Sequence, residues 1–231
     1  MNALDNILRK IADDFSPAVL ASSLSAEDMV LTDAIARAGL PIGVFVLDTG
    51  RLHADTLDLI QQIKLHFGME VQIFTPDPAA VADYVSANGR DAFYGDIALR
   101  KRCCEIRKVE PLSRALAGKR AWITGQRREH GELRAQLAER ELDPVHGIEK
   151  FNPLAAWSEA EVWNYVRRHR VPYNRLYDQG YRSIGCAPCT RPVLPGEDVR
   201  AGRWWWEQAE AKECGLHVAP DGRLVRAKEM I

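Results

Sequence analysis

The sequence predicts an α/β fold with a parallel sheet flanked by helices, and three observations lead to that prediction. Short apolar segments suited to strands alternate with helical segments through the first half of the chain. Polar turns follow three of the expected strands, as happens where parallel strands end at a ligand-binding edge. The chain has 231 residues and 46% hydrophobic content, which is enough for a domain with its own core.

The first four expected elements are two helices and two strands. Residues 3–14 have helical periodicity, and residues 18–21 form a short apolar strand. A helix over 27–38 ends at Gly39, since glycine readily takes the left-handed conformation at a helix C-terminus. Residues 42–47 form a continuous apolar run, which is typical of a strand buried on both faces.

The alternation continues with a helix over 57–66, which ends at Gly68, and a strand over 70–74, which ends before Pro76. Two further elements complete this part of the fold, a helix at 109–117 and a strand at 120–123.

The character of the chain changes after residue 150. Residues 151–154 are expected to be extended, and Ser158 with Glu161 has capping-box spacing before a helix that reaches His169. The last segment is rich in Arg and Trp and resembles an appended arm. We therefore divide the chain into an α/β domain, residues 1–194, and a mobile C-terminal arm, residues 195–231.

The charge and the N-terminus exclude several classes of partner and location. A net charge of −1 provides no overall field for nucleic acid or an anionic membrane, so we expect neither partner. The segment MNALDNILRKIADDF lacks the apolar core of a signal peptide, and no apolar run is as long as a membrane span. We therefore expect a cytoplasmic protein with reduced or metal-bound cysteines. A homo-oligomer is compatible with the sequence, which does not fix the oligomeric state.

Three polar turns, Ser22–Asp28, Asp48–Leu52 and Thr124–Arg128, are expected to line one crevice. In the first, backbone N–H groups at a helix N-terminus and serine hydroxyls can cradle a phosphate, whereas the alternative is an ordinary N-cap. In the second, Gly50 allows a sharp turn and Arg51 can meet an anion. The alternative there is a loop that caps the next helix with Asp48 or Thr49.

Five cysteines give the most specific signal in the chain: Cys103 and Cys104 are adjacent, Cys186 and Cys189 form a C-x-x-C, and Cys214 stands alone. Neighbouring residues seldom both reach one small cation, whereas a 4Fe–4S cluster offers each thiolate its own iron. This favours a cluster over structural zinc. The alternative is that the four are buried apolar residues, but polar residues surround both pairs.

Two further features concern charge near the cysteines. Lys101, Arg102, Arg107 and Lys108 flank the adjacent pair, where they can stabilise an anionic cluster, meet a substrate anion or form a solvated helix face. Cys214 lies among charged residues that favour the nucleophilic thiolate, the alternative being a surface cysteine without a role.

Together these segments resemble the assimilatory adenylyl-sulfate (APS) reductases of the PAPS/APS reductase group. The resemblance runs from about Ser22 to His217, and its motifs are SSLSAED, LDTGRLH, KRCCEIRK, TGQRRE, GCAPCTRP and KECGLH. It implies an adenine-nucleotide α-hydrolase-like, Rossmann-like fold, with one 4Fe–4S cluster on the CC and C-x-x-C cysteines. It also implies that Cys214 is the nucleophile and that thioredoxin or glutaredoxin regenerates it.

The resemblance also implies which residues bind the substrate, adenylyl sulfate. The implied nucleotide contacts are Ser23, Ser25, Asp28, Leu47, Gly125 and Arg128, with Arg51 as a further candidate. The cations expected at the phosphosulfate are Lys108, Arg200, Arg203 and His217. They are needed because a thiolate anion attacks an anionic substrate.

One departure concerns the first polar turn. Related pyrophosphatases have a glycine-rich SGGxDS loop, whereas Leu24, Ser25 and Ala26 occupy that region here. Fewer glycines restrict close backbone approach to a pyrophosphate, which fits a protein that does not cleave ATP. Three alternatives stay open: a 3′-phospho-APS (PAPS) reductase, an ATP-dependent thiolation or adenylation enzyme, and a zinc-stabilised binding module.

Overall fold

The computed structural model describes residues 3–131 and 134–207, and its centre is a six-stranded sheet of order β3-β2-β1-β4-β6-β5. All neighbouring strands are parallel except β5 and β6, which form an antiparallel hairpin at one edge. The strands are β1 (Ala18–Ser22), β2 (Ile42–Leu47), β3 (Val71–Phe74), β4 (Ala121–Ile123), β5 (Arg140–Asp143) and β6 (Ile148–Phe151).

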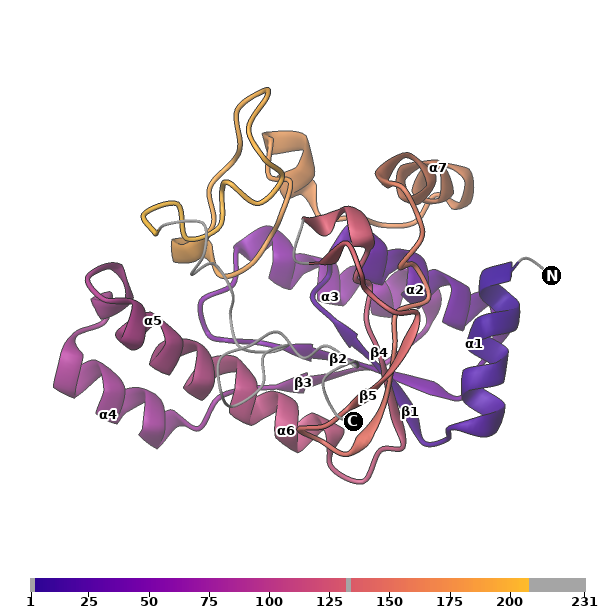
Figure 1. Ribbon diagram of the computed structural model, residues 1–231, viewed down its shortest axis with the longest axis horizontal. Coiled ribbons are helices and arrows are strands. Elements are labelled where there is room, and N and C mark those ends of the chain that lie inside the picture. Colours follow the sequence, from indigo (N-terminus) through magenta and orange to yellow (C-terminus); the bar gives the residue numbers. More distant parts are fainter. Residues whose placement is uncertain (1–2, 132–133, 208–231) are drawn as a thin grey trace.

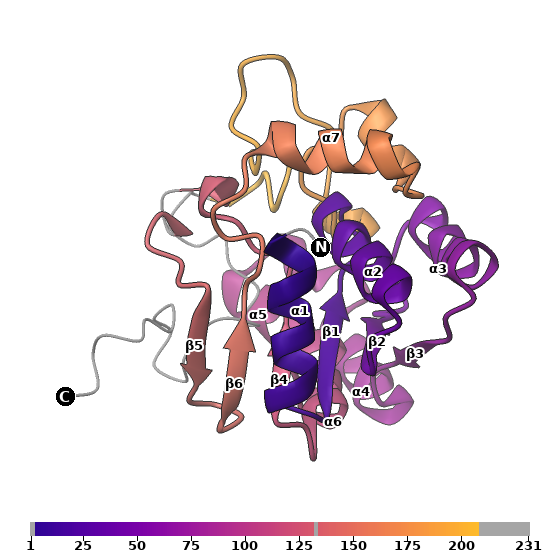
Figure 2. The same ribbon diagram turned by 90° about the vertical axis from the view of Figure 1, so that its right-hand side faces the viewer.

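Helices cover both faces of this sheet. Figure 2 shows α1, α2 and α3 in front of the strands and α4, α5 and α6 behind them, with α7 beyond the arrowheads of β1 and β6. The helices are α1 (Ala3–Asp14), α2 (Ala26–Ala38), α3 (Ala54–Phe67), α4 (Pro78–Asn88), α5 (Ile97–Cys104), α6 (Glu110–Leu116) and α7 (Glu159–His169). A π-helical turn, Glu105–Val109, joins α5 to α6, so these three segments follow one another as a single long helix (Figure 1).

Alternate residues of the central strands fill two separate cores. In β1, Leu20 packs into the core beneath α1, α2 and α7, whereas Val19 packs with α6 on the other face. In β4, Ile123 and Trp122 divide between the two faces in the same way. This period of two follows from strand geometry, and burial on both faces explains the nearly continuous apolar runs. Burying a large side chain such as Phe45, which is 1% exposed, contributes about 2 kcal/mol.

The predicted α/β fold is confirmed, with three differences. The helix expected at 109–117 belongs to a longer helical segment that begins at Ile97 and contains the adjacent cysteines. The helix α4 and the hairpin of β5 and β6 were not expected from the sequence. The hairpin is polar, with Arg140, Glu141, Glu149 and Lys150 in its strands, so apolar periodicity does not reveal it.

None of the helices in the described part of the chain is long and apolar enough to span a membrane.

Candidate active site

A cavity of about 250 Å³ lies beyond the carboxyl ends of β1, β2 and β4. The three polar turns predicted to share a crevice all contribute to its wall. The sheet places them together because neighbouring parallel strands end at the same edge, where open α/β sheets bind their ligands. The predicted binding residues in its wall are Ser23, Ser25, Asp28, Leu47, Lys108, Gly125, Arg200 and Arg203.

The turn after β1 is organised around the carboxylate of Asp28. Its Oδ2 accepts hydrogen bonds from the backbone N–H of Ser23 at 2.7 Å and from the hydroxyls of Ser23 at 2.6 Å and Ser25 at 3.2 Å. Burial raises the pKa of Asp28, and the charge of Glu27 adds to this, while the serine hydrogen bonds oppose it. Ser25 is also the N-cap of α2, as the alternative interpretation proposed.

The turn after β4 touches the same carboxylate. The backbone N–H of Gly125 donates to Asp28 Oδ1 at 3.0 Å. A Cβ at Gly125 would lie 2.5 Å from that oxygen and 2.8 Å from the Cβ of Glu27. Only glycine therefore allows the two turns to meet at this point.

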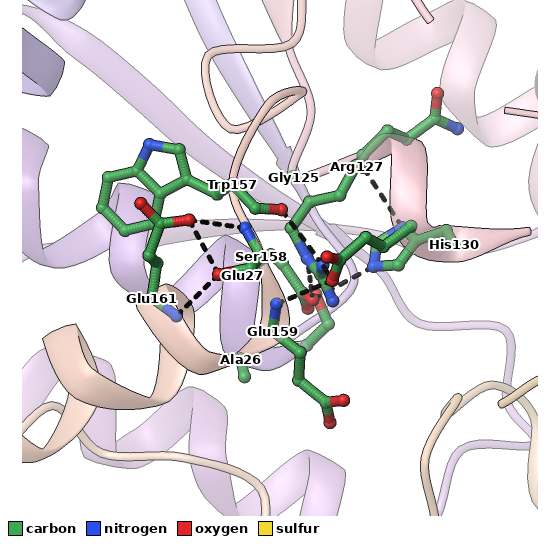
Figure 3. Close-up of polar contacts among 12 residues, drawn as sticks. Ala26, Glu27, Gly125, Arg127, His130, Trp157, Ser158, Glu159 and Glu161 are labelled. Carbon is green, nitrogen blue, oxygen red and sulfur yellow. Dashed lines mark hydrogen bonds and ion pairs between the residues drawn. The ribbon is translucent and has the colours of Figure 1, made fainter. Parts of the chain in front are cut away.

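A buried ionic network lies behind these turns (Figure 3). Glu27 Oε1 accepts from Arg127 Nε at 2.8 Å and pairs with His130 Nε2 at 3.0 Å. Burial alone would raise the pKa of Glu27, but hydrogen bonding and positive charge from His130 and Arg127 lower it to about 2. Arg127 also donates to the carboxylate of Glu129 and the carbonyl of Trp157, so the network joins α2, the turn after β4 and the loop that precedes α7.

The turn after β2 connects the cavity to the cysteines. Thr49 Oγ1 lies 3.2 Å from Cys186 Sγ, and the Thr49 carbonyl accepts from Arg107 Nη1 at 2.7 Å. The backbone N–H of Ala187 donates to the carbonyl of Arg51 at 2.8 Å, which fixes the C-x-x-C turn against this loop. Neither Asp48 nor Thr49 caps the following helix, because its N-cap is His53.

The four cysteines predicted to bind a cluster converge from two distant parts of the chain. Cys103 and Cys104 end α5, whereas Cys186 and Cys189 bracket a short 3₁₀ turn. Cys103, Cys186 and Cys189 pack together with a set of aromatic side chains, Phe93, Trp204 and Trp206. In the described ranges, no three His, Cys, Asp or Glu side chains are arranged to hold a single metal ion.

Burial and nearby cations set the ionisation of these thiols. Burial raises the pKa of Cys103, and that of Cys189 to about 12, and the neighbouring Cys186 adds to both shifts. Burial also opposes ionisation of Cys186, but Lys108, the Thr49 hydroxyl and nearby arginines lower its pKa. Of these three thiols, only Cys186 is therefore favoured as a thiolate by the cations around it.

Two buried N–H groups beside the thiols have no hydrogen-bond partner among the described residues. They are Nε of Arg203 and Nε1 of Trp204. Buried donors are normally paired, so unpaired donors beside a cluster of thiols fit an anionic group with acceptor atoms at this place. Arg203 is held there by a hydrogen bond from Nη1 to the carbonyl of Ile184, and a Cβ at Gly185 would lie 2.5 Å from its Nη2.

Some predicted residues lie away from this cavity or outside the described ranges. Arg51 pairs with Asp91 at 2.6 Å, and Arg128 donates to the carbonyl of Leu137 at 3.0 Å; neither is part of the cavity wall. Cys214 and His217 lie outside the described residues.

Comparison with known proteins assigns the chain to a family. The family model described as phosphoadenosine phosphosulfate reductase domain matches residues 17–192. The chain belongs to the phosphoadenosine phosphosulfate reductase family.

Two bacterial relatives of this family are similar over nearly the whole chain. An adenosine 5'-phosphosulfate reductase from Allochromatium vinosum is 56% identical over 91% of this chain and 82% of its own length. An enzyme with the same name from Burkholderia cepacia is 55% identical over 93% of this chain and 86% of its own length.

Solved structures agree with this assignment. A phosphoadenylyl-sulfate (PAPS) reductase from Candida auris, solved as a phosphate complex, superposes with a TM-score of 0.71. It is 26% identical and covers 83% of this chain and 91% of its own. An FMN adenylyltransferase from Candida glabrata, 14% identical with a TM-score of 0.54, shares the fold and covers 91% of this chain and 75% of its own. The predicted family and adenine-nucleotide α-hydrolase-like fold are therefore confirmed.

Several residues of the site were not selected from the sequence. Glu27 and Arg127 lie within the quoted motifs SSLSAED and TGQRRE, but no periodicity distinguishes them from surface charges. The sequence indicates Thr49 only as a possible helix cap and Trp204 only as part of the arm. Along the chain, Thr49 and Trp204 are far from the cysteines they contact, so only the fold shows that they lie together.

Proposed function

We propose that this chain is an adenylyl-sulfate reductase that converts APS to sulfite and AMP in sulfate assimilation, the step that supplies reduced sulfur for cysteine synthesis. One observation carries the proposal. The cavity at the carboxyl ends of the strands extends from the serine turn, suited to a nucleotide, to Cys186 of the four-thiol group. Lys108, Arg200 and Arg203 line the same cavity. A nucleotide phosphosulfate needs such an arrangement, with an apolar part for the base and cations for the anions.

Ser23, Ser25 and Gly125 are proposed to bind the nucleotide at the strand ends, together with Leu47 and Asp28. The apolar wall near Leu47, with Phe45 and Trp122, is suited to an adenine ring, since it contributes aromatic and aliphatic surface. Arg51 and Arg128 stay predictions without support from the cavity.

The cysteines Cys103, Cys104, Cys186 and Cys189 are proposed to hold one 4Fe–4S cluster. The two unpaired N–H donors beside them support an anionic metal–thiolate group at this place, and the adjacent pair favours a cluster over zinc, since each thiolate can bind its own iron. When bound, the cluster supplies a fixed anionic centre beside Lys108, and the two electrons of the reaction come from thiols. Lys108 and Arg203 act on the substrate by neutralising its charge.

The proposed reaction uses Cys214 as the nucleophile. Its thiolate attacks the sulfur of the sulfonate group, the bond from that sulfur to the phosphate oxygen breaks, and AMP leaves with the bonding electron pair. A thiolate of thioredoxin or glutaredoxin then attacks Cys214 Sγ, which releases sulfite. The second thiol of the reductant resolves the mixed disulfide, so that the dithiol is oxidised and Cys214 is regenerated. The mobile arm, 195–231, and a cytoplasmic location stay predictions.

A single anaerobic experiment tests this function. Wild-type enzyme is incubated with APS alone, and the peptide that contains Cys214 is examined by mass spectrometry. We expect one sulfonate adduct, which reduced thioredoxin removes with formation of sulfite. The variant Cys214→Ser keeps its iron and forms neither adduct nor sulfite, because its hydroxyl is not ionised at neutral pH. PAPS in place of APS separates the two reductases, and turnover of PAPS in preference to APS would refute the proposal.

A further inference from the structure

Arg100 is a buried cation that the predicted chemistry does not use. It lies on α5, one turn before the adjacent cysteines, and its exposed fraction is 0%. Its Nε and Nη2 each donate to one carboxylate oxygen of Glu207 at 2.8 Å. Glu207 is the last residue that the structure describes before the segment containing Cys214. The two side chains are only 1% and 2% exposed, so this ion pair lies in the interior.

The same guanidinium contacts two groups at the thiol site. It lies 4.7 Å from the ring of Trp204, and the guanidinium of Arg203 lies 4.6 Å from the same ring. Arg100 also hydrogen-bonds the Cys104 thiol, and although burial opposes its charge, Glu207 and Cys104 raise its pKa. Arg100 thus contacts a predicted cluster ligand, the aromatic ring beside the cavity cation Arg203 and the end of the described chain.

The segment from Arg203 to Glu207 also meets the helix that carries Cys103 and Cys104 through apolar packing, since Trp204, Trp206 and Cys103 belong to one cluster. Its backbone is held by hydrogen bonds from Trp204 N to the Cys189 carbonyl at 3.2 Å and from Glu207 N to the Trp204 carbonyl at 2.9 Å. The first of these reaches the C-x-x-C turn, and the second is local. The Arg100 side chain supplies a polar attachment to the other cysteine pair.

We propose that Arg100 is a positioning residue, which ties the segment 203–207 to the cysteine-bearing helix and so fixes Arg203 in the substrate cavity. This inference rests on the proposed function, because it assumes that the cavity binds a nucleotide. Bidentate pairing with Glu207 and stacking on Trp204 both require the planar fork of arginine. A lysine keeps the charge but provides neither, so the two side chains are not equivalent here.

Two variants separate positioning from simple burial of charge. Arg100→Lys keeps a cation opposite Glu207. The double variant Arg100→Met with Glu207→Leu removes both charges together, which avoids the unpaired buried carboxylate that Arg100→Met alone would leave. The control is Arg102→Met on the same helix, because the pair of Arg102 and Glu105 is exposed, at 57% for each side chain.

Hydrogen exchange of the backbone amides at 203–207 is the first measurement, with iron content and melting temperature recorded on the same samples. The second is the dissociation constant for AMP. We expect both variants to keep their iron and a melting temperature near that of the wild type. Exchange at 203–207 is expected to be about tenfold faster, and AMP binding several-fold weaker. The control variant is expected to match the wild type.

Wild-type exchange and wild-type AMP affinity in both variants would overturn the proposal, since Arg100 would then only fill space. If wild-type protein does not bind AMP, the proposed function fails, and the exchange measurement alone decides whether Arg100 ties the segment. The two failures are therefore distinguishable.

Discussion

The backbone of Gly125 lies against the carboxylate of Asp28, so that the turns after β4 and β1 share one hydrogen bond and leave no room for a side chain. The donor distance is 3.0 Å, and a Cβ would stand 2.5 Å from the accepting oxygen. Asp28 in turn holds the hydroxyls of Ser23 and Ser25. The contact between these two turns therefore requires that residue 125 has no Cβ.

Gly125→Ala is expected to separate the two turns and weaken AMP binding at least tenfold, because the Asp28 carboxylate and the backbone at this point must move apart. Isothermal titration with AMP measures the effect. Gly95→Ala is the matched control, since a Cβ there would meet its nearest atom, the Ala92 carbonyl oxygen, at an ordinary 3.6 Å. Unchanged affinity in Gly125→Ala would show that the contact of the two turns is not needed for binding.

Glu27 is expected to stabilise the protein in a pH-dependent way. Its pKa is lowered to about 2 from an ordinary value of 4.5. The stabilisation is therefore fully present above about pH 4.5 and is lost as the pH falls through about 2. At neutral pH it corresponds to about 3 kcal/mol of unfolding free energy. Urea titrations of wild type and Glu27→Gln are expected to differ by this amount at pH 7.

The difference in unfolding free energy between wild type and Glu27→Gln is expected to become smaller as the pH falls below about 4.5. The exposed Glu105, paired with Arg102, serves as the control, and Glu105→Gln is expected to cost less than about 1 kcal/mol at any of these pH values. A constant gap between wild type and Glu27→Gln across the range would contradict the ionic role of Glu27.

Cys186→Ser and Cys189→Ser are each expected to lose most of the iron and acid-labile sulfide of anaerobically prepared enzyme, because a serine hydroxyl is a poor substitute for a thiolate ligand. Wild type is expected to contain about four of each per chain. Cys214→Ser provides the control, since it makes the same chemical change at a position outside the proposed ligand set. Stoichiometric zinc without iron in the wild type would falsify the cluster assignment.

Arg203→Met is expected to lower kcat/KM for APS by about 10- to 100-fold, because it removes a cation from the anionic end of the cavity. Arg203→Lys is expected to recover part of the loss, since it keeps the charge without the planar fork. Arg191→Met is a suitable control. Arg191 pairs with Glu197 at 2.8 Å and does not line the cavity. Equal losses in the control and in Arg203→Met would indicate a general disturbance of this region.

The sequence predicts the central strands well, and the reason is physical. The apolar runs of β1 and β2 are buried on both faces, and Gly39 and Gly68 end their helices in the left-handed conformation. Because the order of strands and helices also requires their polar turns to meet at one edge, most predicted binding residues line the cavity. The number and pairing of the cysteines predict that they share one metal group, and Cys103, Cys186 and Cys189 do pack together.

The parts that could not be predicted depend on contacts between distant residues. The hairpin of β5 and β6 is an edge element with a polar pattern, so burial does not mark its strands. Glu27 is buried by Arg127 and His130, and Arg100 by Glu207, although isolated charges of these types are normally exposed. Nothing local in the chain distinguishes such pairs from surface ion pairs such as Arg102 with Glu105.

The separation of the two cysteine pairs along the chain has a consequence for how the protein is made. A cluster held by Cys104 and Cys186 closes a loop of about 80 residues, and cross-links of that size restrict the unfolded chain by about 4 to 5 kcal/mol. Cys104 precedes β4 in the chain, whereas Cys186 follows all six strands, so the loop can close only after the whole sheet has been synthesised. The proposed cluster would therefore be inserted into a chain whose sheet can already form, and a chain without it would lack this cross-link.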